Sequence, residues 1–310
     1  MRGERGFALL AVTLVLALLA VIVGEFAFSM RLEATMVRSY REEVIGRHLV
    51  EAAVQQAIRE ILTDSQLVGL ADGALTFFRL PARALPRLAR ADAPLGRGTF
   101  SYRITDEEAR INLNTAPPDR VDRLLATLGV DKQARDTIND SLQDWRDANE
   151  LRRLNGAESD DYLKLPVPYR ARNTNLEDVA ELLQIHGVTP ELYFGRDDAP
   201  GLAEFVTVRG AGQVNINTAA PTVLKALGLS DAEVSEITQA RTAAPYPAVP
   251  ARFTGRGLSV TTRTFRVEAE GRVDGQITAR VVAIVQKGSD VGGQPTGVIV
   301  SWNPTPGGRP

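Results

Sequence analysis

The sequence predicts an α+β protein in which a long N-terminal helix packs on an antiparallel sheet and a large helical domain is inserted into that sheet. Three observations predict this fold class. A helical pattern without proline runs from Phe7 to about Leu62, alternating strands flank Asp274-Gly275, and a unit reading apolar-Asn-apolar-Asn-Thr-Ala occurs twice between these regions. The helical units therefore interrupt the sheet in sequence.

The composition excludes several functional classes. Of the 310 residues, 44% are hydrophobic and 24% are charged, which is typical of a folded protein rather than of a disordered chain or a multi-span membrane protein. The formal net charge of -2 provides no overall attraction to nucleic acid. The chain has no cysteine, which excludes disulfides and cysteine-ligated zinc. It has only two histidines, too few for a histidine metal cluster and few for histidine-dependent catalysis.

The N-terminus carries a candidate membrane anchor. An apolar run, 7–28, follows Arg2 and Arg5 and is interrupted only by Glu25. About 20 such residues span a bilayer core as a helix, and the arginines place its start in the cytoplasm. A cleaved secretory signal would have a shorter apolar region, whereas here an amphipathic pattern continues to about Leu62. We expect one helix of about 55 residues, with its first third in lipid.

The predicted sheet comes from segments far apart in the chain. Residues 257–287 alternate apolar and polar positions on both sides of Asp274-Gly275, a dipeptide typical of tight hairpin turns. A strand at about 98–104 joins them, so the helical domain is inserted over 106–250. The tail, 289–310, is rich in glycine and proline and is expected to be flexible.

The inserted region contains internal repeats. Segments 111–130 and 214–241 each pass from the Asn-Thr-Ala unit through a proline into leucines at helical spacing, then reach Leu-Gly-apolar. A weaker copy lies at 175–188. We expect Thr115 and Thr218 to cap the helices and the asparagines to satisfy local backbone groups.

These repeats resemble helix-hairpin-helix or SAM-like domains, some of which bind the DNA backbone. Basic residues near the two hairpins alternate with acidic ones, as in Asp119-Arg120 and Asp122-Arg123. Phosphate binding would require a clearer positive surplus. We therefore expect a protein-binding helical domain, and nucleic acid is not an expected partner.

The most specific signature lies between the repeats. It consists of Asp144-Trp145-Arg146-Asp147, then Gly156-Ala157-Glu158 with acidic and tyrosine residues after it, then Pro168-Tyr169 and Asn173. This order, with the two Asn-Thr-Ala units, resembles the protein K (GspK) family of the type II secretion system. The long N-terminal helix likewise resembles type IV pilins, and the resemblance covers essentially the whole chain.

This resemblance implies a minor pseudopilin at the tip of the secretion pseudopilus, nucleating or capping it during export across the outer membrane. Gly6 and Phe7 then flank the prepilin peptidase cleavage site, and Phe7 becomes N-methylated. Most pilins have glutamate at the fifth mature position, where this chain has Ala11. That departure is typical of protein K and suits a subunit with no neighbour above it.

Further implications concern location and partners. The chain would cross the bacterial inner membrane once, with its N-terminus in the cytoplasm and its bulk in the periplasm. The implied partners are the other minor pseudopilins, the prepilin peptidase that processes the chain, and the secretin or exported cargo. Glycine-rich phosphate loops, GxSxG and HExxH motifs are all missing from the sequence, so we expect no enzymatic activity.

An acidic loop is the candidate metal site. Its oxygen-bearing side chains are Asp147, Asn149, Glu158, Asp160 and Asp161. Calcium prefers such ligands in sets of six to eight, and the family resemblance implies a structural calcium ion here. A solvated acidic loop is the alternative, because EF-hand spacing is missing, Asn149 stands where a carboxylate is common, and Arg152 and Arg153 are close.

These observations divide the chain into six parts and leave two competing functions. The parts are a leader (1–6), a transmembrane part (7–28), a periplasmic helix with the first sheet segment (29–105), the inserted helical domain (106–250), C-terminal strands (251–288) and a flexible tail (289–310). The competing functions are a membrane-anchored helix-hairpin-helix DNA-binding protein of a competence-like system and an anchored adaptor without peptidase processing.

Overall fold

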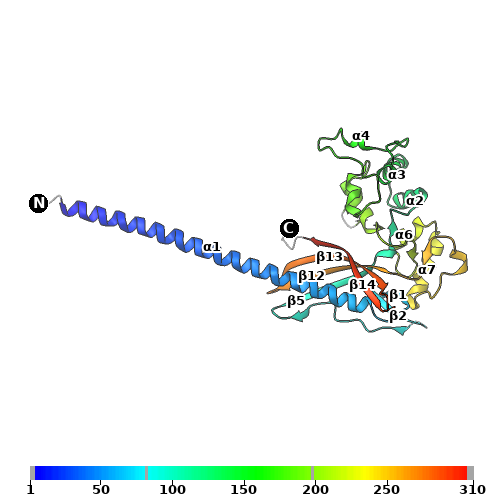
Figure 1. The fold of residues 1–310 in the computed structure, drawn as a ribbon, viewed down its shortest axis with the longest axis horizontal. Coiled ribbons are helices and arrows are strands. Elements are labelled where there is room, and N and C mark those ends of the chain that lie inside the picture. The colour runs from blue at the N-terminus through cyan, green and yellow to red at the C-terminus, as the bar shows by residue number, and fades with distance from the viewer. Residues whose placement is uncertain (1–3, 81–82, 197–198, 306–310) are drawn as a thin grey trace.

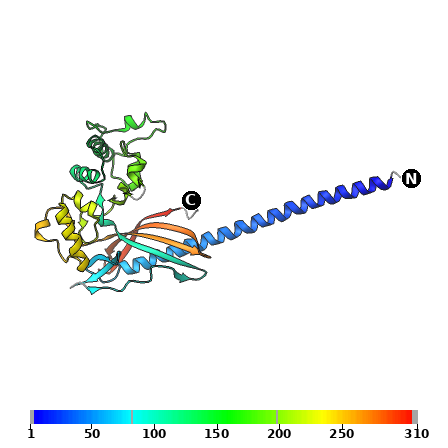
Figure 2. The ribbon, with the colours of Figure 1, turned by 180° about the vertical axis from the view of Figure 1, so that it is seen from behind.

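A computed structural model describes residues 4–80, 83–196 and 199–305 of the chain. One helix, α1 (Glu4–Ile61), contains 58 residues and is about 87 Å long at 1.5 Å per residue. Figures 1 and 2 show its N-terminal part extending away from the rest of the molecule. The predicted single long helix is confirmed. Among the described residues, α1 is the one helix long and apolar enough to cross a membrane.

The C-terminal part of α1 packs on a five-stranded antiparallel sheet of order β14-β13-β12-β5-β4. Its strands are β4 (Ala93–Leu95), β5 (Gly98–Asp106), β12 (Thr264–Val273), β13 (Gln276–Ser289) and β14 (Pro295–Thr305). Small residues of α1, such as Ala53 and Ala57, are fully buried against Val267 and Val285 of the sheet. Their size lets the helix approach the strands closely.

The predicted hairpin around Asp274-Gly275 is present between β12 and β13, with both turn residues at positive φ. Such backbone angles define the two-residue turn that fits twisted antiparallel strands. The predicted strand at about 98–104 is also present, as β5.

The prediction of a flexible tail after Gly288 is wrong for most of the described part of that segment. Residues Pro295–Thr305 form β14, which pairs with β13 along its length. Ile299 packs on the main core from this strand. Because β14 is at the sheet edge, its prolines cost no interior ladder bonds. Residues 306–310 lie outside the described part of the chain.

A small sheet follows α1 and completes the core. It contains β1 (Leu67–Ala71), β2 (Ala74–Arg79) and β3 (Arg83–Ala84) in antiparallel order. The segment between this sheet and β4 is fixed by Arg90, which donates two hydrogen bonds of 2.7 and 3.0 Å to buried Glu60 of α1.

The segment between β5 and β12 forms the helical insertion. Its α-helices are α2 (Pro118–Thr127), α3 (Lys132–Arg146), α4 (Ser159–Tyr162), α5 (Pro190–Phe194), α6 (Pro221–Ala226) and α7 (Asp231–Ala243). Its short strands are β6 (Ile111–Asn112), β7 (Gly195–Arg196), β8 (Ala199–Pro200), β9 (Val206–Thr207), β10 (Val214–Asn215) and β11 (Leu258–Ser259). The 3-10 helices are Glu107–Ala109, Val179–Gln184, Leu202–Glu204 and Ala251–Phe253. The insertion has an apolar core separate from that of the sheet.

The two strong repeats have equivalent contacts. In each, a short strand forms a parallel pair with a later strand: β6 with β9, and β10 with β11. Arg146 donates to the carbonyls of Leu113 and Ala116, and Arg241 donates to those of Ile216 and Ala219. The weak third copy differs, since it contains only the 3-10 helix Val179–Gln184.

The predicted threonine caps are wrong. The residues before α2 and α6 are Pro117 and Ala220, and neither makes a side-chain cap bond. A proline at the first helical position already removes one unpaired N–H group there. The prediction for the asparagines is confirmed: Asn112 Oδ1 accepts from the Asn114 amide at 2.9 Å, and Asn215 makes the equivalent bond at 3.0 Å.

Candidate functional site

The predicted peptidase site is at the free end of α1. Gly6 and Phe7 lie in its first turns, and the Phe7 side chain is 78% exposed. Residues 1–3 of the predicted leader lie outside the described part of the chain. Every side chain described between Phe7 and Arg41 is exposed, and Figure 1 shows this part of α1 without neighbouring elements. An apolar helix surface of this kind requires lipid or other protein chains to cover it.

The second candidate site is the acidic loop after α3. Trp145 at the end of α3 packs edge-on against Tyr162, with ring centroids 5.3 Å apart, and Tyr162 stacks on Tyr169 at 5.1 Å. This aromatic cluster fixes the three parts of the signature next to one another. It also explains why the motif contains Trp145 and both tyrosines, since these rings form the local core under the loop.

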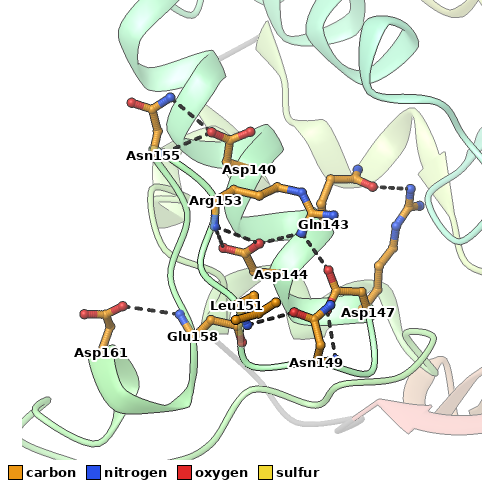
Figure 3. Close-up of polar contacts among 11 residues, drawn as sticks. Asp140, Gln143, Asp144, Asp147, Asn149, Leu151, Arg153, Asn155, Glu158 and Asp161 are labelled. Carbon is orange, nitrogen blue, oxygen red and sulfur yellow. Dashed lines mark hydrogen bonds and ion pairs between the residues drawn. The ribbon is translucent and has the colours of Figure 1, made fainter.

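Arg153 lies between Asp144, in the last turn of α3, and Asp147, which directly follows α3 (Figure 3). Its Nη1 atom is 2.6 Å from Asp144 Oδ1 and 2.6 Å from Asp147 Oδ2. The Arg153 amide also donates to the Asp144 carboxylate, at 3.1 Å to Oδ2. Hydrogen bonding to Asp147, with that to Asp144, raises the pKa of Arg153 above its ordinary value. Asp144 itself is fully buried, so its negative charge is compensated by this one side chain.

The five predicted metal ligands do not form one set. Asp147 Oδ1 accepts from the backbone and side-chain amides of Asn149, and Asn149 Oδ1 accepts from the Leu151 amide. Asp160 is exposed. Asp161 Oδ2 accepts from the Glu158 amide, and Figure 3 shows it on the side of Glu158 away from Asp147. Among the described residues, no group of three or more His, Cys, Asp or Glu has the arrangement of a metal site.

Glu158 is the unusual member of the loop. Its side chain is 3% exposed, and neither carboxylate oxygen has a hydrogen-bond partner among the described residues. Burial, together with the nearby charges of Asp144, Glu150 and Asp147, raises the pKa of Glu158 to about 7. Four carboxyl groups therefore face a common region, of which sequence reasoning selected two.

Sequence reasoning missed Asp144, Glu150 and the bridging position of Arg153. Glu150 accepts from the Ser159 hydroxyl at 2.9 Å and from Asn173 Nδ2 at 2.8 Å. The Asp-Trp-x-Asp spacing was the available signal for Asp144, because its residues one turn apart near a helix end face the same side. No signal indicated that Arg153 turns back onto α3, since that depends on the path of the loop.

A DNA-binding interpretation would need free backbone amides at the two hairpin glycines, Gly129 and Gly228. The Gly129 amide donates to Ala126 O and the Gly228 amide donates to Lys225 O. The amides of Val130 and Leu229 are likewise bonded within their own repeats. The Arg256 guanidinium donates a hydrogen bond to the Gly228 carbonyl. These hairpin amides are therefore already used and are not free for phosphate oxygens.

Similar proteins agree on one family. A family model for "Type II secretion system (T2SS), protein K" matches residues 103–195. Type II secretion system protein K of Pectobacterium carotovorum is 32% identical over 32% of this chain and 35% of its own length. The protein K of Pseudomonas aeruginosa is 29% identical over 73% of this chain and 68% of its own, and that of Klebsiella pneumoniae is 28% identical over 83% and 81%.

A solved structure has the same fold. A chain of the GspK-GspI-GspJ complex from the enterotoxigenic Escherichia coli type 2 secretion system matches with a TM-score of 0.65 and 20% identity. The match covers 88% of this chain and 99% of that one, so it includes both the sheet and the helical insertion. The chain is therefore similar in sequence to type II secretion system proteins K and has the fold of a chain in the GspK-GspI-GspJ complex.

Proposed function

We propose that this chain is a minor pseudopilin of the type II secretion system that stands at the tip of the secretion pseudopilus, where it nucleates or caps the filament during export across the outer membrane. The observation that supports this is the position of the insertion. Figures 1 and 2 show it at the end of the molecule opposite the free N-terminal end of α1. If α1 is parallel to the filament axis, the insertion occupies the space where a further subunit would stack.

The proposed partners are other minor pseudopilins, contacted through α1 and the sheet. Large apolar side chains are exposed on α1 beyond the transmembrane part, including Met36 at 57%, Val37 at 63% and Tyr40 at 70%. A soluble helix with this exposure is stabilised by packing against neighbouring helices. The similar solved chain comes from a complex of GspK with GspI and GspJ, which supports the same class of partner here. We further propose that the insertion faces the secretin or exported cargo.

We propose a single-pass inner-membrane location with a cytoplasmic N-terminus and a periplasmic bulk. Arg2 and Arg5 precede the apolar run, and positive residues favour the cytoplasmic side. Prepilin peptidase would then cut between Gly6 and Phe7, and Phe7 would be N-methylated. Ala11 supports the tip position, because a subunit without the usual carboxylate lacks the charge that pairs with a neighbour's N-terminus inside lipid.

The N-terminal mass of the membrane-isolated protein tests the processing proposal. Cells with active prepilin peptidase should yield a chain that begins at methylated Phe7, and cells without it should yield the full chain. Gly6→Leu should block cleavage, and Gly24→Leu serves as the matched control in the same helix, because no atom lies within 4 Å of a Cβ added there. An uncut N-terminus in both strains would contradict peptidase processing and support the alternative hypothesis of an anchored adaptor.

The tip position can be tested separately by single-site labelling. The chain has no cysteine, so Leu154→Cys, at a site that is 89% exposed on the insertion, introduces one reactive thiol. Gold-labelled maleimide should then mark one end of each pseudopilus, and the cysteine-free parent should show no label. Label distributed along the filament would contradict the tip position.

Two of the predicted roles have less support. The DNA-binding alternative predicts salt-dependent affinity, and the internally bonded hairpin amides oppose it. Calcium binding stays a prediction, but the five residues selected for it do not fit one ion as a set, because Asp161 and Asn149 bond to the loop backbone and Arg153 occupies the contact between Asp144 and Asp147.

A further inference from the structure

We propose that Arg153 is a built-in cation that holds the acidic loop together in place of a calcium ion. Its Nη1 atom is 2.6 Å from one carboxylate oxygen of Asp144 and 2.6 Å from one of Asp147, as Figure 3 shows. A guanidinium group carries a permanent positive charge and forms strong hydrogen bonds to carboxylates. Because it is covalently attached, it needs no free ion in the periplasm to occupy this place.

The loop is shaped so that Arg153 reaches this position. Asp140 of α3 accepts from both the backbone amide and the side-chain amide of Asn155, each at 3.0 Å. Gly156 then passes so close to α3 that a Cβ at this position would overlap the Asp144 carboxylate. These contacts bend the chain back on α3 and leave Arg153 over Asp144.

The charges around the site show what Arg153 compensates. Asp144 is fully buried, and its carboxylate oxygens contact the side chain and the amide of Arg153. Asp147, Glu150 and the unpartnered carboxyl of Glu158 are near the same point. Arg146 is near too, but its guanidinium is bonded to the Leu113 and Ala116 carbonyls and to Gln143. Arg152 pairs with Asp161, at 3.6 Å, outside this group.

Removing the guanidinium should therefore create a calcium site. Asp144 and Asp147 would remain as hard oxygen donors on the two sides of the vacated position, and carboxylate oxygens are the ligand type that Ca²⁺ binds. We expect Arg153→Gln to lower the unfolding temperature of the full chain in detergent by about 5 °C or more in EGTA, and added Ca²⁺ should restore most of this loss. The unchanged chain should unfold at the same temperature with EGTA and with Ca²⁺.

Control variants separate this role from an ordinary ion pair. Arg152→Gln removes the adjacent exposed arginine and should change neither the unfolding temperature nor its response to Ca²⁺. Arg153→Lys retains a cation, so its unfolding temperature should not change with Ca²⁺. If Arg153→Gln does not fold, the unfolding temperature of Arg153→Lys in EGTA and in Ca²⁺ is measured instead. Adding Asp147→Asn to Arg153→Gln should abolish the rescue by Ca²⁺.

Terbium provides a second readout, because Trp145 and Tyr162 lie under the loop and can sensitise the luminescence of a bound ion. Arg153→Gln should show sensitised Tb³⁺ emission that Ca²⁺ displaces, and the unchanged chain should show none. Two results would overturn the proposal. One is stabilisation of the unchanged chain by Ca²⁺, which would mean that the ion displaces Arg153. The other is a destabilised Arg153→Gln chain that Ca²⁺ does not rescue.

Discussion

Buried charges at the junction between the sheet and the insertion are satisfied by partners distant in sequence. Asp106, at the end of β5, is 4% exposed and accepts hydrogen bonds from Asn215, Thr218 and Thr262. Burial raises the pKa of Asp106 above its ordinary value, although these three donors act in the opposite direction. Such bonds join residues more than 100 positions apart, so the junction forms only when the whole insertion is folded.

Glu107 provides a prediction at this junction. It is 1% exposed and accepts from Arg266 at 2.9 and 3.0 Å and from Arg110 at 2.7 Å. Glu107→Gln leaves both arginines without their carboxylate, and we expect a loss of about 3–5 kcal/mol in the free energy of unfolding near neutral pH. Denaturant unfolding of the full chain in detergent, followed by tryptophan fluorescence, measures this difference.

The effect of Glu107→Gln on stability should depend on pH. Burial alone would raise the pKa of Glu107, but the hydrogen bonds and charge of Arg266, with the charge of Arg110, hold this pKa below its ordinary value. The stabilisation is therefore present above the unfolded pKa of about 4.5 and is lost as the pH falls through the lower folded pKa. The difference in the free energy of unfolding between the unchanged chain and Glu107→Gln should therefore become smaller at acidic pH. Glu270→Gln in β12 is the control, because its pairs with Arg272 and Arg280 are partly exposed and should contribute about 0–1 kcal/mol.

At the level of single residues, the sequence predicts little of this chemistry. Asp106 and Glu107 look like ordinary solvated acids in the sequence, and their burial depends on partners that only the tertiary fold provides. The same limit applies to Arg153, which the sequence identifies as close to the acidic loop but not as the side chain that joins Asp144 to Asp147.

Secondary-structure elements were easier to predict where local patterns determine them. The α1 helix has no proline, and β12 and β13 alternate around Asp274-Gly275, so their local and tertiary preferences agree. The edge strand β14 was missed because its glycine and proline content is typical of loops. Pairing with β13 stabilises it nonetheless, and that pairing is a long-range contact that residue composition does not report.

Helix α1 approaches strand β13 closely at a glycine, and this close approach predicts the effect of a substitution there. Gly46 is buried, and a Cβ at this position would overlap Thr278 Oγ1 of β13. Gly46→Ala should therefore destabilise the fold by about 1–3 kcal/mol, although alanine favours helix more than glycine does. Thermal unfolding of the full chain measures the change.

A compensating substitution and a control test this explanation. Adding Thr278→Gly removes the overlapping side chain, so the double variant should recover part of the stability that Gly46→Ala loses. Gly24→Ala is the same change in the same helix, and no atom lies within 4 Å of its new Cβ. It should cause no loss. Equal losses for both glycines would show that the close approach to β13 is not the reason.

For the whole molecule, the sequence predicted the class of fold but not how the insertion is fixed to the sheet. The repeats, the long helix and the hairpin all carry local patterns. The position of the insertion depends instead on the junction at Asp106 and Glu107 and on its separate apolar core. These contacts hold the insertion at the end of the molecule opposite the N-terminus, which Figure 2 shows from behind.

Removal of the insertion tests the role of the whole arrangement. The chain leaves the sheet at Asp106 and returns beside it, because Asp106 is paired directly with Phe265. Residues 107–264 can therefore be replaced by Asn-Gly, a sequence that closes antiparallel strands as a two-residue turn. The sheet core should still fold, since its apolar cluster shares no residue with that of the insertion. A far-ultraviolet spectrum and a cooperative melt of the shortened chain in detergent establish that it has folded.

If the insertion caps the pseudopilus, the shortened chain should still join the other minor pseudopilins but leave the filament end open to further subunits. We expect normal co-purification with them, longer pseudopili in electron micrographs, and reduced release of exported protein into the medium. Leu154→Cys in the intact chain, left unlabelled, is the control for handling and expression. Filaments of ordinary length with full export would show that the cap lies elsewhere, and loss of co-purification would show that the insertion itself makes the contacts assigned to α1 and the sheet.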